Sequence, residues 1–160
     1  MFKVHEITPA AHAQDIWTVQ RNSWERFHLK KIIIIIIKVA WRGTTLATGS
    51  LDQSVKLWRT GAPPVSLKAH TLAVVSVDVN SEGVVASSGL DSVVALHDSA
   101  GAPLHSLKSA PGECYALRFA PSGTRLATSS KTGTVSEWDT KSGTKVRTLE
   151  AGGRFGICVA

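Results

Sequence analysis

Hydrophobic and polar residues alternate along three similar stretches of the chain, and a short polar turn interrupts each stretch near its middle. The stretches are TTLATGSLDQSVKLW (44–58), GVVASSGLDSVVALH (83–97) and TRLATSSKTGTVSEW (124–138). Alternation with a period of two predicts β-strands with one buried face, so each stretch should form a strand, a tight turn and a second strand. The last residues, Trp58, His97 and Trp138, recur at nearly equal intervals, which indicates an internal repeat.

Each repeat contains two further predicted strands, one on either side of the alternating stretch. The preceding strands are DIWTV (15–19), AVVSVDV (73–79) and CYALRFA (114–120), and the following ones are PVSLKAH (64–70), PLHSLKS (103–109) and KVRTLEA (145–151). Clusters of Gly, Pro, Asn and Ser separate the strands. Four short strands in about 40 residues are the sequence signature of one blade of a WD-repeat β-propeller.

The expected fold is therefore all-β, a partial WD-repeat propeller of about three four-stranded blades. Blade 1 covers about 12–70, blade 2 about 71–110 and blade 3 about 111–151, and residues 152–160 resemble the start of a fourth blade. Known propellers close with about four to eight blades, so three blades leave the ring open. We therefore expect the chain to correspond to the N-terminal part of a longer propeller.

Residues at matching positions of the repeats resemble the buried Asp–His–Ser/Thr–Trp network of WD-repeat propellers. In that network the carboxylate orients one imidazole nitrogen, the other nitrogen meets the hydroxyl, and the hydroxyl meets the indole N–H. We interpret the histidines as structural, and we expect no catalytic residue, metal ligand or cofactor. The matching residues are His12, Thr48 or Ser50, Asp52 and Trp58 in blade 1, His70, Ser87 and Asp91 in blade 2, and Trp138 in blade 3. His97 replaces the tryptophan in blade 2, and in blade 3 Ala110 stands at the histidine position and Thr132 at the aspartate position, so only blade 1 is complete.

Several motifs, in the order of the blades, are similar to the small WD-repeat subunit of the superkiller (Ski) complex. They are AHAQDIW (11–17), ATGSLDQSVKLW (47–58), AHTLAVVSVDV (69–79), ASSGLDS (86–92), ALRFAPSGTRLAT (116–128) and SGTKVRTLEAGGRF (142–155). The resemblance implies a seven-bladed, non-catalytic adaptor of cytoplasmic 3′-to-5′ mRNA decay with the exosome, which holds a helical-repeat scaffold subunit and an RNA helicase. In animals it also implies a place in the nuclear complex that associates with elongating RNA polymerase II.

The residues themselves favour a protein-binding scaffold over an enzyme. The sequence contains no G-x-S-x-G, P-loop or H-E-x-x-H motif, and no pair of carboxylates at a useful spacing. A purely solvated rim, a scaffold of another complex and a propeller that contacts RNA remain the alternatives. The candidate protein-binding residues lie near the tight turns and the loops that lead into each blade: Asp15, Trp17, Leu51, Ala73, Leu90, Glu113, Tyr115 and Lys131.

One segment breaks the repeat period. The interval from His70 to its counterpart Ala110 matches the period, but the interval from His12 to His70 is longer by nearly half a blade. Removing VQRNSWERFHLKKIIIIIIK (19–38) brings the two intervals close to agreement and joins DIWT to VAWRGTT. The junction restores an uninterrupted inner strand, IWTVAW, so the excess segment splits a strand instead of extending a loop, where insertions are normally tolerated.

The same segment, 19–38, accounts for most of the positive charge of the chain. It contains five Lys or Arg and one Glu, so the net charge falls from +6 to +2 without it, which weakens the case for a nucleic-acid surface. Its six isoleucines are too few to span a membrane. Because a Val codon begins with GT and a Lys codon can end in AG, we hypothesise that 19–38 is a translated intron. A genuine expansion and a functional insertion, such as a partner-binding strand, are the alternatives.

Overall fold

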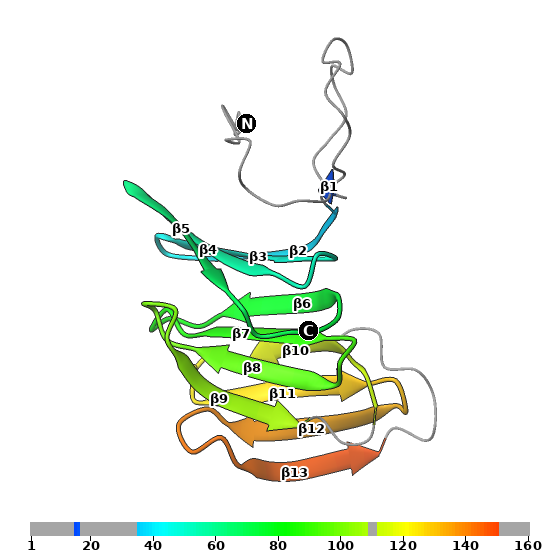
Figure 1. The fold of residues 1–160 in the computed structure, drawn as a ribbon. Helices are drawn as coiled ribbons and strands as arrows, with labels where there is room; N and C mark the ends of the chain where they lie inside the picture. Colours follow the sequence, from blue (N-terminus) through cyan, green and yellow to red (C-terminus); the bar gives the residue numbers. More distant parts are fainter. Residues whose placement is uncertain (1–14, 17–34, 109–111, 151–160) are drawn as a thin grey trace, which may run out of the picture.

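The computed structural model describes residues 15–16, 35–108 and 112–150, which contain thirteen strands and no helix (Figure 1). The strands form three sheets that are stacked in chain order, and they confirm the all-β prediction. No helix of the described residues is long and apolar enough to cross a membrane, and these residues contain no group of three His, Cys, Asp or Glu that could hold a metal ion.

Each sheet follows the predicted order of four antiparallel strands, and the first sheet gains one short extra strand. Blade 1 contains β1 (Asp15–Ile16), β2 (Ile35–Arg42), β3 (Thr45–Ser50), β4 (Val55–Arg59) and β5 (Ala62–Leu67). Blade 2 contains β6 (Val74–Val79), β7 (Val85–Gly89), β8 (Val93–His97) and β9 (Pro103–Lys108). Blade 3 contains β10 (Cys114–Phe119), β11 (Arg125–Ser130), β12 (Thr134–Asp139) and β13 (Lys145–Glu150).

The inner strand of blade 1 differs from the predicted one. The strand beside β3 is β2, with the sequence IIIKVAWR, and it begins inside the range 19–38 that we assign to the insertion. Asp15 and Ile16 form β1, which pairs in parallel with Ile35 and Ile36 of β2. Both pairs have the same separation along the chain, and this separation equals the length of 19–38. The two segments that fit the inner-strand position therefore lie side by side, and the rest of DIWTV lies outside the described residues.

The core lies between neighbouring sheets, because each sheet buries its apolar alternate positions against the next one. Between blades 1 and 2 the buried residues are Ala40, Ala47, Val55, Leu57, Leu67, Val74, Val77, Val79 and Val85. Between blades 2 and 3 they are Ala86, Val94, Leu96, Leu107, Cys114, Leu117, Phe119, Leu126 and Trp138. This stacking holds the tight turns of all three blades at one edge, which we call the rim. The rim comprises the β3–β4, β7–β8 and β11–β12 turns with the β5–β6 loop and residues 112–113, directly before β10.

Candidate functional site

The polar network of blade 2 links the β5–β6 loop to strand β7 and to the β7–β8 turn. His70 Nδ1 lies 3.1 Å from Asp91 Oδ1, and His70 Nε2 lies 2.9 Å from Ser87 Oγ. Asp91 also accepts backbone N–H bonds from Thr71, at 2.8 Å, and Val93, at 3.2 Å. The predicted residues His70, Ser87 and Asp91 are therefore in contact with one another. The Asp91 carboxylate also holds the β5–β6 loop at Thr71 and the end of the β7–β8 turn at Val93.

The carboxylate of Asp91 lies at the centre of this site, where it is ionised and closely packed. Burial alone raises the pKa of Asp91, but the bonds from the Thr71 N–H and from His70 outweigh it, so the pKa lies below its ordinary value. Gly89 leaves the space that this pair needs. A Cβ at Gly89 would lie 2.6 Å from Asp91 Oδ1 and 2.7 Å from His70 Nδ1, so only glycine fits without displacing the network.

The order of these contacts is that of a Ser–His–Asp triad, in which a histidine activates a serine that attacks the substrate. Here Ser87 is fully buried, and so is the side chain of His70. A nucleophile must reach the substrate atom that it attacks. The geometry therefore fits a structural clamp, as the sequence pattern predicts, and it offers the Ser87 hydroxyl no route to a substrate.

In blade 1 the structure decides which hydroxyl meets the tryptophan. Trp58 Nε1 donates to Thr48 Oγ1 at 3.0 Å. Ser50 Oγ instead accepts the backbone N–H of Asp52 at 3.2 Å, so Ser50 shapes the β3–β4 turn. Asp52 in turn accepts the backbone N–H of the residue two positions later, at 2.9 Å. His12, the remaining predicted member of this network, lies outside the described residues.

Blade 3 keeps the indole bond, and the threonine that accepts it was not among the predicted residues. Trp138 Nε1 donates to Thr128 Oγ1 at 3.0 Å, and Thr128 Oγ1 donates to the carbonyl of Ser136 at 3.4 Å. Thr128 could have been found by alignment, because LATSS of blade 3 matches LATGS of blade 1 and places Thr128 at the position of Thr48.

Blade 2 lacks this indole bond, because His97 stands where the other blades have tryptophan. His97 is buried, and its Nδ1 atom has no hydrogen-bond partner within the described residues. Burial lowers the pKa of His97, the nearby His70 lowers it further, and Asp98 opposes the shift. Each blade thus carries only part of the four-residue network within the described part of the chain.

We expect Trp138→Phe to lower the free energy of unfolding by about 1–2 kcal/mol, because the buried hydroxyl of Thr128 then no longer accepts a hydrogen bond from the indole N–H. Urea denaturation of the purified chain measures this change. His97→Phe is the matched control, since His97 occupies the same position in blade 2 and its Nδ1 has no partner within the described residues. Equal losses in both variants would show that packing of the ring, and not the indole bond, stabilises the blade.

The rim carries apolar side chains where a solvated turn would normally be polar. Leu51 in the β3–β4 turn is 40% exposed and Leu72 in the β5–β6 loop is 49% exposed, while Leu90 in the β7–β8 turn is half-buried. The Leu90 N–H donates to the carbonyl of Ala73 at 2.9 Å, which joins turn and loop. Leu72 was not among the predicted contact residues, although it has the same character.

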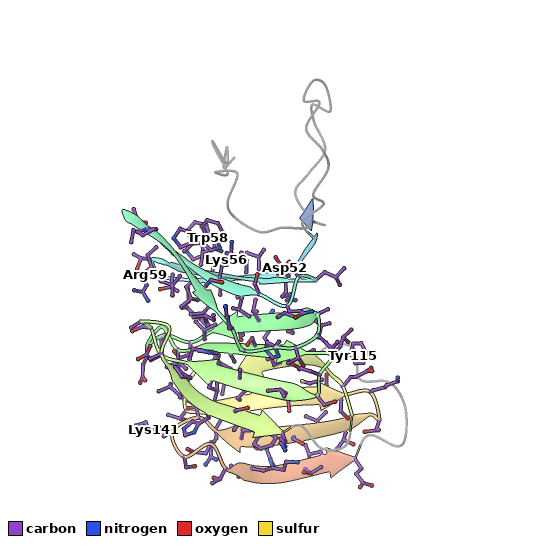
Figure 2. All side chains as sticks on the ribbon, in the orientation of Figure 1. Asp52, Lys56, Trp58, Arg59, Tyr115 and Lys141 are labelled. Carbon is purple, nitrogen blue, oxygen red and sulfur yellow. The ribbon has the colours of Figure 1, made fainter. Side chains whose placement is uncertain are left out.

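In blade 3 the structure brings the predicted rim residues Glu113, Tyr115 and Lys131 together. The Tyr115 hydroxyl donates to Glu113 Oε2 at 2.7 Å, and Lys131 Nζ lies 3.5 Å from the same oxygen. The hydrogen bond from Tyr115 lowers the pKa of Glu113, and the same bond raises the pKa of Tyr115. Figure 2 shows Asp52 and Tyr115 at the same edge of the stacked blades, opposite the edge with Arg59 and Lys141.

The rim contribution of blade 1 is described only in part. Asp15 of β1 pairs through its backbone with Ile35 of β2, and Trp17 lies outside the described residues.

Two parts of the chain match a family model described as WD domain, G-beta repeat, over residues 34–59 and 101–139. These parts include β2 to β4 of blade 1 and most of blade 3, and they stand in sheets of the expected strand order. The chain is a partial WD-repeat propeller. The match omits residues 60–100, which contain β5 and the strands β6 to β8 of blade 2, where His97 replaces the tryptophan of the motif.

Two curated relatives of the partial propeller are named as WD-repeat proteins, and a third is named as a component of a complex. WD repeat-containing protein VIP3 of Arabidopsis thaliana is 35% identical over 68% of this chain and 35% of its own length. WD repeat-containing protein SL1-17 of Schistosoma mansoni is 30% identical over 97% of this chain and 49% of its own length. A third relative, COMPASS component SWD3 of Saccharomyces cerevisiae, is 30% identical over 68% of this chain and 39% of its own length. The chain spans half or less of the length of these relatives.

A solved structure has the same fold as the partial propeller. A chain in the crystal structure of the mitotic checkpoint complex superposes with a TM-score of 0.67 at 23% identity, over 73% of this chain and 38% of that one. At this identity the similarity shows the fold alone. The three blades thus correspond to only a part of that longer chain.

Proposed function

We propose that the partial propeller is a non-catalytic scaffold that binds other proteins through its rim. The observation that carries this proposal is the exposure of Leu51 and Leu72 at the rim, where the neighbouring turns are otherwise polar. An exposed leucine in a tight turn contributes little to folding, whereas an apolar anchor surrounded by polar groups contributes much of the energy of a protein interface.

The rest of the rim has the properties that such an interface needs. The Asp91 carboxylate accepts the backbone N–H of Thr71, next to Leu72 in the β5–β6 loop, and that of Val93, at the end of the turn that contains Leu90. This part of the rim is therefore held in one conformation before a partner binds. A rigid surface loses less conformational entropy on binding than a mobile one. In blade 3 the Glu113–Tyr115–Lys131 cluster provides a polar border beside the apolar residues.

We further propose that the protein is the WD-repeat adaptor of a superkiller-type complex in mRNA decay with the exosome. The support is the similarity of its motifs to that subunit, together with the assemblies that the names of similar proteins mention, a COMPASS component and a mitotic checkpoint complex. The partners would be the helical-repeat scaffold subunit and the RNA helicase. This role places the protein in the cytoplasm, with a second, nuclear role beside elongating RNA polymerase II.

We expect Leu51→Asp and Leu72→Asp each to weaken binding to the purified helical-repeat subunit at least tenfold, because a charge replaces an exposed apolar anchor. Biolayer interferometry with the immobilised partial propeller measures the affinity, and the melting temperature should stay within a few degrees of the unsubstituted chain. Leu104→Asp is the matched control, since Leu104 is similarly exposed on the outer strand β9, away from the rim.

Two results would contradict these proposals, and they are distinguishable. If Leu104→Asp weakens binding as much as the rim variants, the rim is not the contact surface. If neither the helical-repeat subunit nor the helicase binds the unsubstituted chain, the superkiller assignment fails. The proposal of a rim scaffold is then tested by measuring how the same variants bind the partners that the unsubstituted chain captures.

A further inference from the structure

His97 lies in the buried contact between blades 1 and 2. The strand registers place it beside Val85, which pairs in turn with Val79, so the three side chains share one face of the sheet. Both valines pack in one apolar cluster with Leu57 and Leu67 of blade 1. Only 6% of the surface of His97 is exposed, so its imidazole is buried between two sheets.

The imidazole of His97 does not make the bond that tryptophan makes at this position of the other blades. There the indole N–H donates to Thr48 or Thr128, and the register places Ser87 at the same position in blade 2. The Ser87 hydroxyl contacts His70 Nε2, and His97 Nδ1 has no hydrogen-bond partner within the described residues. A neutral imidazole leaves only a lone pair without a partner there, whereas a protonated one would carry an N–H and a positive charge that nothing accepts.

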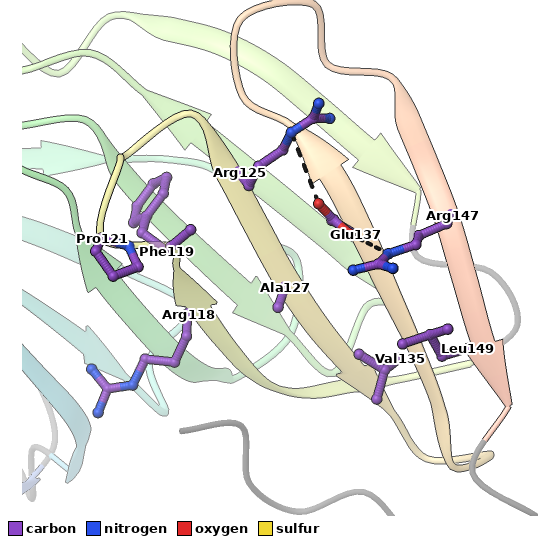
Figure 3. A pocket seen from close by; sticks show the side chains of 10 residues that line it. Arg118, Phe119, Pro121, Arg125, Ala127, Val135, Glu137, Arg147 and Leu149 are labelled. Atoms are coloured by element: carbon purple, nitrogen blue, oxygen red, sulfur yellow. Dashed lines mark hydrogen bonds and ion pairs between the residues drawn. The ribbon is translucent and has the colours of Figure 1, made fainter.

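Blade 1 presents cations, and no carboxylate, on the described strands that face His97. Leu57 occupies the position that Glu137 holds in blade 3. In blade 3 that carboxylate pairs with Arg147 and, at 3.8 Å, with Arg125 (Figure 3). Alternation along β2 and β4 places three charged residues on the side of blade 1 that faces blade 2, and all are cations: Lys38, Arg42 and Arg59.

The carboxylates of blade 2 are engaged elsewhere or exposed. Asp78 accepts a backbone N–H of blade 3 at 2.9 Å, and Asp91 is paired with His70. Asp98 lies in the β8–β9 turn, and its carboxylate accepts two backbone N–H groups of that turn, each at 2.8 Å. Glu82 is exposed in the β6–β7 loop. The surroundings of the buried imidazole therefore favour its neutral form.

The same surroundings set the pH range in which this imidazole takes up a proton. Burial lowers the pKa of His97 below its ordinary value of 6.5, the nearby His70 lowers it further, and Asp98 opposes the shift. The unfolded chain, in which this histidine is solvated, therefore binds the proton more readily than the folded chain. The stabilisation by the neutral ring is complete above the ordinary value and is lost as the pH falls through the lower folded-state pKa.

We propose that His97 makes the contact between blades 1 and 2 sensitive to acid. While the imidazole is neutral, it packs in this contact at the position of the tryptophans of the other blades, and a proton on the ring loosens the contact. An indole takes up no proton in this range, so blade 2 alone among the described blades has this property. The range lies above the one in which Asp91 takes up its proton, so the two effects are separable.

Urea denaturation of the whole chain at about pH 7.5 and about pH 5.5 tests this proposal, because one histidine that stays neutral in the folded state raises the unfolding equilibrium constant by up to about tenfold over this interval. We expect the constant of the unsubstituted chain to rise about five- to tenfold more than that of His97→Phe, whose ring cannot be protonated. His97→Trp, which restores the residue of the other blades, should lose the same part of the pH dependence.

His105→Ala is the matched control. His105 is half-buried between blades 2 and 3, and its Nε2 bonds the Lys141 carbonyl at 2.9 Å, so this variant should keep the pH dependence of the unsubstituted chain. If both His97 variants respond to pH as the unsubstituted chain does, His97 is not the acid-sensitive group. If His105→Ala abolishes the response, acid does not act at the contact between blades 1 and 2.

An NMR titration of the unsubstituted chain decides the question even if the His97 variants fail to fold. The Cε1–H signal of His97 should keep the position of a neutral imidazole at about pH 5.5, where a solvated histidine is mostly protonated. A signal that titrates at the ordinary pKa while the chain stays folded would refute the proposal.

Discussion

His70→Ala is expected to lower the free energy of unfolding by about 3 kcal/mol, a large part of the stability of a domain of this size. The substitution leaves the Asp91 carboxylate buried with its backbone bonds only and deprives the Ser87 hydroxyl of its partner. Removing a hydrogen-bond partner of a buried carboxylate costs more than the interaction itself contributes, because the carboxylate keeps its desolvation penalty. Urea denaturation at neutral pH measures the effect.

His105→Ala is the control for this loss. His105 is half-buried and makes a hydrogen bond from Nε2 to the Lys141 carbonyl at 2.9 Å, so its removal should cost about 1 kcal/mol or less. Gly89→Ala is a second way to break the same network without removing a polar atom. Its methyl group would force His70 and Asp91 apart, and the loss should approach that of His70→Ala. If Gly89→Ala is neutral, the network does not hold the blade.

The pH dependence gives an independent check on the same network. The pKa of Asp91 is lower in the folded chain than its ordinary value of 3.8, so the unfolded chain binds the proton more readily. The stabilisation by the ionised carboxylate is therefore complete above that ordinary value and is lost as the pH falls through the lower folded-state pKa. In acid, the difference between the unsubstituted chain and Asp91→Asn should shrink.

Much of this architecture follows from local patterns in the sequence. Alternation predicted the strands of blades 2 and 3 closely, because each strand buries one face against a neighbouring sheet. The partnership of His70, Ser87 and Asp91 followed from motif positions. Thr48 and Ser50 could not be separated in this way, since both point to the same side of β3, and only the register with Trp58 decides between them.

Other features depend on which sheets pack against each other. The alternation of residues along a strand carries no information about this packing. Val39 and Val77 occupy equivalent positions with the same side chain, yet one is half exposed and the other is buried. The difference is the presence of a preceding blade. For the same reason the 52% exposure of Leu149 was not foreseen, although this residue belongs to a strand that the alternation predicted.

The inner strand of blade 1 is where sequence and structure differ most, and the repeat shows which segment fits the position better. The strand registers place Ile35, Ile36 and Lys38 at the positions of Ala73, Val74 and Ser76 in blade 2. The offset of the β1–β2 pairs places Asp15, Ile16 and Thr18 at the same positions. The buried second position receives isoleucine in both cases, so it does not discriminate between the segments.

The other positions of the strand do discriminate. Blade 3 has Glu113 and Tyr115 where one segment supplies Asp15 and Trp17, an acidic and an aromatic residue, and the other supplies two isoleucines. The last position holds the small residues Ser76 and Ala116 in the other blades, which threonine matches better than lysine. DIWT therefore fits blade 3 at three positions where IIIK does not, whereas Val75 of blade 2 is matched better by isoleucine.

Two deletions of equal length turn this comparison into a measurement. Deleting 19–38 leaves DIWTVAWR as the inner strand, and deleting 15–34 leaves IIIKVAWR, while both variants have the same distance between His12 and His70. We expect the first variant to be more stable by about 2 kcal/mol, because the repeat fills each position with the matching type of residue. Thermal and urea denaturation of the two purified chains measure the difference.

The two deletion variants also show whether the run of isoleucines is a strand of the propeller or a segment that favours aggregation. A segment of six β-branched residues without proline favours aggregation, so the variant without 19–38 should also yield more soluble protein than the full chain. If the variant that keeps IIIK is as stable as the variant that keeps DIWT, or more stable, the isoleucines form the inner strand of blade 1. Transcript reads give the matching genetic result: the intron hypothesis fails if every read across the junction of Thr18 and Val39 contains the codons for 19–38.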